Sequence, residues 1–192
     1  MPISFKRFVI TEALGVAALN AGINAGYTTY MWRKLDPLTL FEVNAIGFDL
    51  ATTPLVVAML STMLGTSATR QKMRDGRVAV PAIRVPASLA SLPRSIVLRG
   101  LALGSVAAIA LALPLLFMMQ ASAIGTLSLA TAVLMKVGIT ALVSLLIVPL
   151  ITFASLADVR RGALDARGLA RPAALAARAF DMPTKPALAD PR

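Results

Sequence analysis

The sequence predicts an all-α, polytopic membrane protein with four transmembrane helices in two helical hairpins and both termini in the cytoplasm. Of the 192 residues, 57% are apolar and only 15% are charged, and the mean hydropathy is +0.77. A soluble domain of about 150 residues buries only about 70% of the surface of its unfolded chain, too little to hide so many apolar side chains. The apolar residues also form long runs, which basic residues flank mainly on one side.

The first two spans are expected at 8–31 and 41–65, because crossing the hydrocarbon layer takes about 20 mainly apolar residues. Tyr27, Tyr30 and Trp32 gather at the end of the first span, where amphipathic rings favour the headgroup layer. Only a short turn separates the two spans, so they are expected to form the first hairpin.

The third and fourth spans are expected at 97–120 and 127–155, joined by a short turn into a second hairpin. The connector 66–96 between the hairpins carries six basic residues and three prolines, so it must lie outside the hydrocarbon. The spans and connector together form a membrane domain over 1–158. The tail 159–192 is rich in Arg and Ala and has three prolines among its last twelve residues, so we expect it to be basic and partly disordered.

The basic residues predict the orientation. Of the 19 Lys and Arg, two lie near the N-terminus, seven lie between residues 70 and 99, and seven follow from Arg160 onward, whereas the opposite flank holds only Arg33 and Lys34. Cytoplasmic flanks carry the excess of Lys and Arg, which places both termini in the cytoplasm of a bacterial-type plasma membrane. Basic residues near this surface are expected to contact anionic lipid headgroups; the candidates are Arg70, Lys72, Arg74, Arg77, Arg160 and Arg161.

Two questions about this topology stay open. Residues 1 to about 25 can be read as a cleaved signal peptide, since Lys6 and Arg7 precede an apolar run, although that run exceeds the usual length of about 7 to 15 residues. The segments 53–56 (TPLV) and 148–151 (VPLI) suggest that the hairpins are repeats, as in many transporters, although proline is common in membrane helices generally.

The composition excludes several kinds of chemistry. The chain contains neither Cys nor His, so it has no disulfide, no thiolate or imidazole ligand, and no nucleophile activated by imidazole. A GxxxxGK[ST] phosphate loop is also missing. We therefore expect no enzymatic activity, no cofactor and no metal. Membrane topology accounts for the net charge of +10, and no aromatic residues interleave with the tail arginines, so we expect no nucleic-acid partner.

Two opposite charges lie inside the predicted spans. An Asp or Lys at the centre of a membrane helix costs about 2.5 to 3.5 kcal/mol on insertion scales, so each needs a reason. Asp49 comes eight residues after Phe41, which corresponds to ~12 Å along a helix. Lys136 comes nine residues after Leu127, or ~13.5 Å. Both helices run inward from the same face, so the two charges are predicted at nearly equal depth.

Asn20 and Asn24 lie on one face of the first span and bracket the depth of the two charges. We therefore predict an intramembrane polar site made of Asp49, Lys136, Asn20 and Asn24. Glu42 lies near the outer boundary of the second span and on the same helical face as Asp49. It is a candidate acid at the outer mouth of this site.

This polar layer has two interpretations. Asp49 and Lys136 can be a structural ion pair, while the asparagines bond to a helix that approaches closely over Ala18, Gly22 and Gly26. Alternatively, the layer is a gated site in which an ionisable residue changes partner or protonation as a solute or a proton passes.

Several short motifs carry a resemblance. They are Asn20 to Asn24 (NAGIN), Ile46 to Asp49 (IGFD), Arg99-Gly100 at the start of the third span, Lys136 midway down the fourth, and Leu156 to Asp158 (LAD) at its end. In these features the chain resembles a group of small four-span bacterial membrane proteins that have no established activity. The resemblance covers the hairpins and not the tail, and it implies no reaction.

The sequence therefore predicts a small integral protein of the bacterial inner membrane, permease-like or channel-like, with an intramembrane polar site. Four helices enclose little space, so we expect a homo-oligomer or a partner membrane protein. The alternative is a noncatalytic subunit or assembly factor, which would dock onto a larger membrane complex through its Arg-rich segments and its small-residue helix faces.

Overall fold

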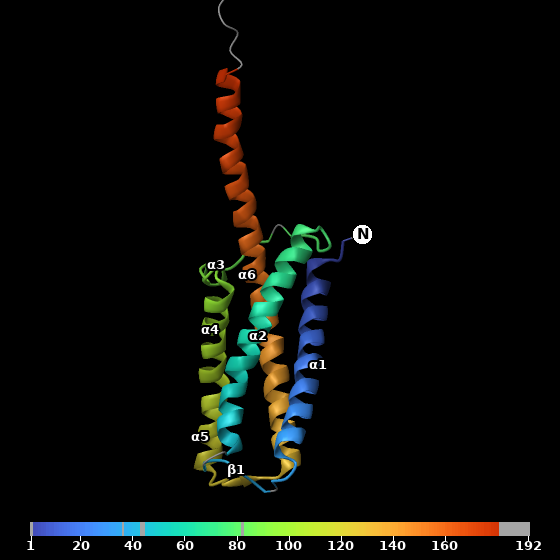
Figure 1. Ribbon diagram of the computed structural model, residues 1–192, viewed down its shortest axis with the longest axis vertical. Coiled ribbons are helices and arrows are strands. Elements are labelled where there is room, and N and C mark those ends of the chain that lie inside the picture. Colours follow the sequence, from blue (N-terminus) through green and yellow to red (C-terminus); the bar gives the residue numbers. More distant parts are fainter. Residues whose placement is uncertain (1, 36, 43–44, 82, 181–192) are drawn as a thin grey trace, which may run out of the picture.

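The computed structural model is a long helical bundle, and it describes residues 2–35, 37–42, 45–81 and 83–180, with side chains described as far as Gly162. Four helical segments are long and apolar enough to cross a membrane, which confirms the all-α polytopic fold. They appear in Figure 1 with the short elements that join them. In chain order the elements are α1 (Phe5–Trp32), β1 (Leu38–Thr39), α2 (Ile46–Arg74), α3 (Ala87–Ala90), α4 (Ile96–Ala107), η1 (Ala108–Ala112), α5 (Leu113–Ala121), β2 (Thr126–Leu127) and α6 (Leu129–Phe180).

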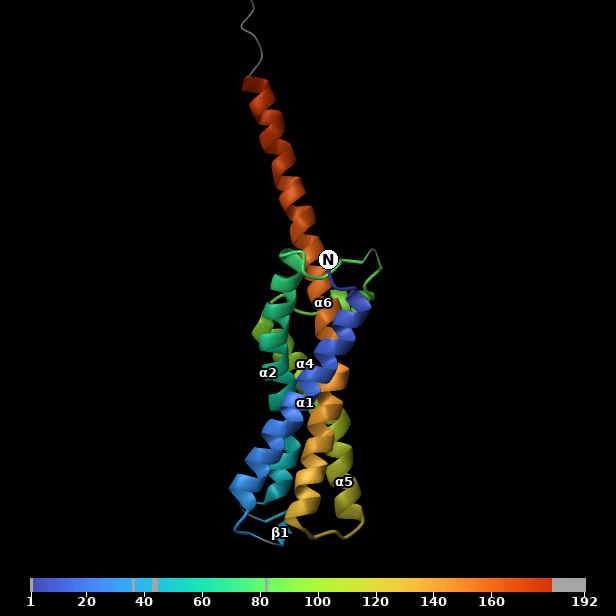
Figure 2. The ribbon, with the colours of Figure 1, turned by 90° about the vertical axis from the view of Figure 1, so that its right-hand side faces the viewer.

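The connections between the helices gather at the two ends of the bundle. The N-terminal segment, the connector that contains α3, and the point where α6 leaves the bundle share one end, here called the basic end (Figure 1). The turns 33–45 and 122–128 share the other end, here called the loop end (Figure 2). There β1 pairs with β2 in an antiparallel register that sets Leu38 opposite Leu127, and both leucines are buried. This pairing ties the two turns to each other.

The second span differs from its predicted bounds of 41–65 at both ends. It begins five residues later, at Ile46, because Ala45 has an extended backbone and its N–H bonds to the Glu42 carbonyl in a turn. It also continues to Arg74, nine residues into the predicted connector. Met73 is buried against the N-terminal part of the chain, so packing continues the helix beyond the apolar run.

The fourth span also continues beyond its predicted end. The helix begins at Leu129 rather than 127 and runs to Phe180 without a break, so residue 159 is no boundary in the backbone. The first two thirds of the predicted tail, residues 159–180, are therefore helical, because Ala and Leu are strong helix formers. Residues 181–192, for which disorder is predicted, lie outside the described part of the chain.

The third span, predicted at 97–120, runs from Ile96 to Ala121 and changes its winding in the middle. Pro114 lacks an N–H group, and its ring would collide with the carbonyl four residues earlier in a regular helix. The π segment η1 precedes it, and Leu113 N–H bonds to the Ala108 carbonyl five residues back. This wider turn lets the helix continue through the proline.

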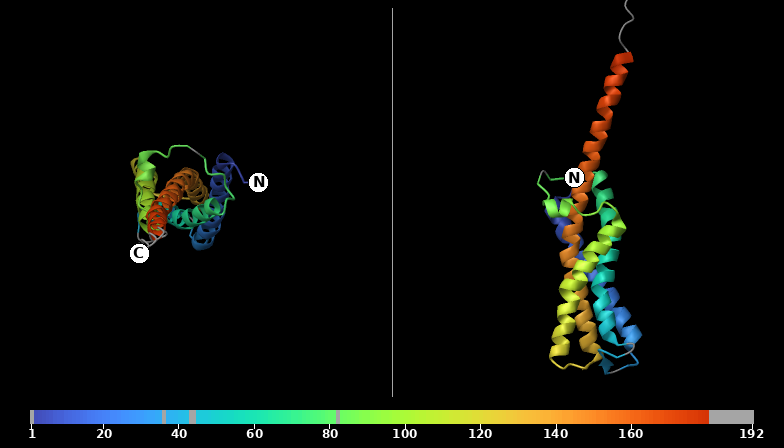
Figure 3. Two further views of the ribbon diagram at one scale, coloured as in Figure 1. Left: turned by 90° about the horizontal axis from the view of Figure 1, so that it is seen from above. Right: turned by 90° about the vertical axis from the view of Figure 1, so that its left-hand side faces the viewer.

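The helices do not pack as two separate hairpins. The main contacts of α1 are with α6, and those of α2 are with α6 and α4, whereas α1 and α2 hardly touch. Seen from above, α6 lies between α4 on one side and α1 and α2 on the other (Figure 3). The structure therefore does not show the expected pairing of the spans as two hairpins, because α1 packs mainly on α6 and α4 packs mainly on α2.

Small residues bring α4 close to α2. A Cβ on Gly100 would lie 3.2 Å from Cγ of Met59, and a Cβ on Gly104 would lie 2.9 Å from the carbonyl oxygen of Leu55. This is a GxxxG contact, in which glycines one turn apart let two backbones approach. The small residues expected to do this on α1 do not, because Ala18, Gly22 and Gly26 are all exposed.

We predict that Gly104→Ala lowers the thermal stability of the purified protein in detergent. The added methyl group would press on the Leu55 backbone, and overpacking of this kind costs about 1–3 kcal/mol. Gly138→Ala is the matched control, because a Cβ there meets no atom within 4 Å. The control should be neutral or slightly stabilising, since Ala is the better helix former. Equal melting temperatures for the two variants would contradict the close contact.

Candidate functional site

Asp49 and Lys136 form an ion pair inside the membrane-spanning part of the bundle. Nζ of Lys136 on α6 donates to Oδ2 of Asp49 on α2 at 2.5 Å, so the charges predicted at equal depth meet. The ammonium also lies 4.6 Å from the centroid of the Tyr27 ring on α1, a cation–π distance. The partners are unequally buried, because the Lys136 side chain is 2% exposed and that of Asp49 is 20% exposed. The carboxylate is thus the more accessible member.

The two asparagines of α1 lie beside this pair. Asn20 donates through Nδ2 to Oγ of Ser61 on α2 at 3.1 Å and to Oγ of Ser144 on α6 at 2.8 Å. Asn24 donates through Nδ2 to the backbone carbonyl of Asn20 at 2.9 Å. Asn20 therefore connects three helices through one amide group. Amide bonds of this kind satisfy polar atoms that have no water to bind in a hydrocarbon layer.

A hollow of about 400 Å³ opens beside the ion pair, between α1 and α2. Its polar lining consists of the four residues predicted for the intramembrane site together with Tyr27, Thr52 and Thr53. Its apolar lining includes Ile23, Val56 and Leu60, each about half exposed, so the hollow opens on the flank of the bundle. The few contacts between α1 and α2 leave room for it, and Figure 1 shows the two helices on either side of α6.

A second hollow of about 440 Å³ extends the first toward the loop end. The two share Tyr27, Asp49 and Thr52 as lining residues, and the second adds Glu42, the predicted outer-mouth acid, together with Trp32. We call the two hollows together the α1–α2 groove. It leads from the exposed Glu42 at the loop end to the ion pair, whose Asp49 lies in the first turn of α2.

Contacts between α1, α2 and α6 close the bundle at its basic end. Phe5, Phe8, Met73, Val78 and Leu156 form a buried apolar cluster there. The N-terminal segment adds a parallel backbone bridge between Ile3 and Val78. On the same end, Lys72 on α2 pairs with Glu12 on α1 and lies over the Phe8 ring. These contacts join α1 to α2 between the groove, whose lining reaches Asn20 and Leu60, and the basic end.

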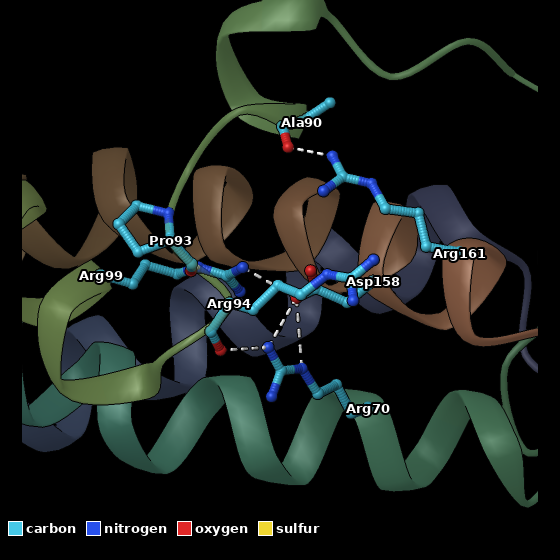
Figure 4. Close-up of polar contacts among 7 residues, drawn as sticks. All are labelled: Arg70, Ala90, Pro93, Arg94, Arg99, Asp158 and Arg161. Atoms are coloured by element: carbon cyan, nitrogen blue, oxygen red, sulfur yellow. Dashed lines mark hydrogen bonds and ion pairs between the residues drawn. The ribbon is translucent and has the colours of Figure 1, made fainter. Parts of the chain in front are cut away.

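Asp158 joins three elements at the same end (Figure 4). Its Oδ2 accepts hydrogen bonds from Nη2 of Arg70 on α2 at 2.6 Å and from Nη2 of Arg99 on α4 at 2.8 Å. The same arginines hold the connector, because Arg99 Nε donates to the Pro93 carbonyl and Arg70 Nη2 to the Arg94 carbonyl. Arg99 is 1% exposed, so its charge depends on Asp158 for compensation. We call Arg70, Arg99 and Asp158 the Asp158 cluster.

Most of the basic residues expected at lipid headgroups have partners inside the protein. Arg160 donates to the carbonyls of Pro81 and Ile83, and Arg161 donates to the carbonyl of Ala90. Arg70 and Lys72 are engaged in the ion pairs described above. A folded connector offers carbonyls and carboxylates within reach of these side chains. Arg74 and Arg77 are exposed, and their contact with lipid headgroups stays a prediction.

The structure thus brings together Asp49, Lys136, Asn20 and Asn24, with Glu42 at the mouth of the same groove. Sequence reasoning missed the role of Tyr27, which it assigned to the headgroup layer. It also missed the serines that accept from Asn20 and the ion pair between Arg99 and Asp158. Helical spacing could have found Tyr27, which lies seven residues after Asn20 and therefore on the same face.

The donor set offers no metal centre, since the described residues contain no group of three or more His, Cys, Asp or Glu side chains that could hold an ion. Comparisons with protein families, with curated proteins and with solved structures find no match for this chain.

We predict unequal effects from breaking the intramembrane ion pair. Asp49→Asn leaves Lys136 as a buried charge without compensation and should cost about 3–5 kcal/mol of stability. Lys136→Met should cost less, because Asp49 has access to the groove. The double variant should recover most of the loss, since it leaves no buried charge without a partner. Thermal unfolding in detergent, analysed as a double-mutant cycle, measures the coupling, and strictly additive effects would show that the pair contributes none.

We also predict that Asp158→Asn destabilises the protein far more than Glu12→Gln. The first change leaves the 1% exposed Arg99 without a counter-charge, which costs about 3–5 kcal/mol. The second breaks a pair whose side chains are 37% and 30% exposed, and exposed pairs contribute at most about 1 kcal/mol. Both variants replace one acid with its amide, so melting temperatures compare directly. A larger loss for Glu12→Gln would overturn the ranking.

Proposed function

We propose that this integral membrane protein is permease-like or channel-like and that a small solute binds in the α1–α2 groove. One observation carries the proposal: the Asp49–Lys136 pair lines an accessible hollow and is not sealed inside the bundle. A pair kept only for packing has no need of an opening, whereas a binding site needs one. Charged residues within a membrane domain commonly mark solute or ion pathways. The geometry calls for no catalytic role.

The closed and open ends fit one state of an alternating-access cycle. The groove opens at Glu42 and ends at the apolar cluster, the Glu12–Lys72 pair and the Asp158 cluster. We propose that the basic end faces the cytoplasm of a bacterial-type plasma membrane, so that this state faces outward. Release to the cytoplasm would then require these contacts to part.

A second candidate function has a specific observation in its favour. The small-residue face of α1, formed by Ala18, Gly22 and Gly26, is exposed, and a Cβ at either glycine would meet no atom of the described residues within 4 Å. Such faces allow another membrane helix to approach closely. The chain can therefore be a noncatalytic subunit or assembly factor of a larger complex, or a homo-oligomer that joins through α1. Copurification with a different protein would favour the subunit.

Water in the groove distinguishes the first candidate, and the chain suits a cysteine-accessibility test because it has no native Cys. We predict that Thr52→Cys, in the shared lining of both hollows, reacts in intact cells with the membrane-impermeant thiol reagent MTSET. Only a hydrated thiol forms the reactive thiolate. Leu134→Cys is the control, because Leu134 is 71% exposed on α6, does not line the groove and should face lipid.

Two results would count against this assignment. If Thr52→Cys is as unreactive as Leu134→Cys, the groove is dry and the permease-like function fails. If Thr52→Cys reacts only in inside-out vesicles, the groove is hydrated but the proposed orientation is reversed.

A further inference from the structure

Most hydrogen-bond donors around the groove are already engaged, and the buried Nε1 of Trp32 is a lining donor without a partner among the described residues. Thr52 donates to the carbonyls of Phe48 and Asp49, and Thr53 donates to the carbonyl of Asp49. Asn20 donates through Nδ2 to Ser61 and Ser144, and Asn24 donates through Nδ2 to the Asn20 carbonyl. An amide that donates through Nδ2 points its carbonyl oxygen away from that partner. The groove therefore offers a ligand mainly acceptors: amide oxygens, hydroxyl lone pairs and carboxylates.

The charges of the groove favour a cation. Its charged lining residues are Glu42, Asp49 and Lys136, which leave one net negative charge. Lys136 is 2% exposed and its ammonium is held by Asp49 and Tyr27, so it is poorly placed to bind an anion. Glu42 is exposed at the mouth, and Asp49 keeps access to the groove.

Aromatic rings surround the loop-end part of the groove. Tyr27, Trp32 and Phe48 line it together with both carboxylates. The chain has only ten aromatic residues in all, so three around one hollow is a marked concentration. Aromatic faces next to carboxylates are a recognised means of binding organic ammonium groups.

The deeper part of the groove supplies an apolar wall. Ile23, Val56, Val57 and Leu60 line it beyond the polar residues. A hollow of about 400 Å³ falls within the usual range for small-molecule sites. A ligand that fits both parts has a positively charged head and an apolar body.

We propose that the groove binds an organic cation, namely a protonated amine that carries an apolar group. The inference rests on the proposed function, because it names the class of solute for that same groove. The ammonium lies among the rings and carboxylates of Tyr27, Glu42 and Asp49, where its N–H groups meet free acceptors. The apolar group extends along Ile23 and Val56.

The single Trp of the chain reports on binding, since Trp32 lines the groove. The test uses the full chain in phosphatidylcholine nanodiscs, titrated with benzylammonium, with neutral benzyl alcohol and with anionic phenylmethanesulfonate. Benzylammonium should give a saturable change in Trp32 emission at a concentration about tenfold lower than the alcohol, the factor to which ~1.4 kcal/mol of ion–aromatic attraction converts. The sulfonate should give no saturable change.

Variants connect this signal to the groove. Glu42→Gln and Asn24→Leu should each weaken benzylammonium binding several-fold without touching the ion pair. Asp75→Asn is the charge-matched control, because it removes one acid at the exposed end of α2, outside the groove, and should leave binding unchanged. Melting temperatures verify that all three variants are folded.

Each other outcome overturns the inference. Equal affinity for the alcohol means that the groove does not recognise charge, and tighter binding of the sulfonate means that Lys136 dominates the site. A saturable change in Trp32 emission with sodium ions and none with the amine means that the groove binds an inorganic ion. If no probe saturates while Thr52→Cys still reacts with MTSET, the solute class is wrong and the permease-like groove stands. If neither signal is seen, both proposals fail.

Discussion

Two ion pairs of opposite polarity between α2 and α6 determine the arrangement of the bundle. Near the loop end α2 supplies the acid, Asp49, and α6 the base, Lys136; at the basic end α2 supplies the base, Arg70, and α6 the acid, Asp158. The partners are 21 residues apart on α2 and 22 apart on α6, roughly 32 Å on either helix. Sliding one helix by a turn would break both pairs at once. The matched spacing of the two pairs therefore specifies a single register between α2 and α6.

This pairing explains why the bundle is open on one flank. Because α2 is committed to α6, and α4 packs on α2 through Gly100 and Gly104, α1 finds its main partner on α6. The first two helices are joined at the basic end by Glu12 and Lys72 and at the loop end only by the chain between them. The groove is the space that this geometry leaves, and the buried Lys136 forms part of its wall.

The spans and the polar layer could be predicted because apolar length and helical rise are local properties. Helical rise could place Asp49 and Lys136 at a similar level, but whether they pair depends on which helices are neighbours. Helix partners are not local, and turn lengths carry no sign that α1 packs on α6. In the sequence, the charges near residue 70 indicate the end of the second span. In the structure, the helix continues past them, and Arg70 and Lys72 pair with Asp158 and Glu12.

The opening of the groove on the flank between α1 and α2 makes the bilayer part of the recognition. A ligand that enters from the hydrocarbon is first concentrated there by its partition coefficient, so its apparent affinity is the intrinsic affinity multiplied by that coefficient. Each added methylene contributes about 0.8 kcal/mol to partitioning, close to fourfold in apparent affinity. Under the proposed function, the protein would discriminate between head groups, while the lipid composition of the membrane would set the preference for chain length.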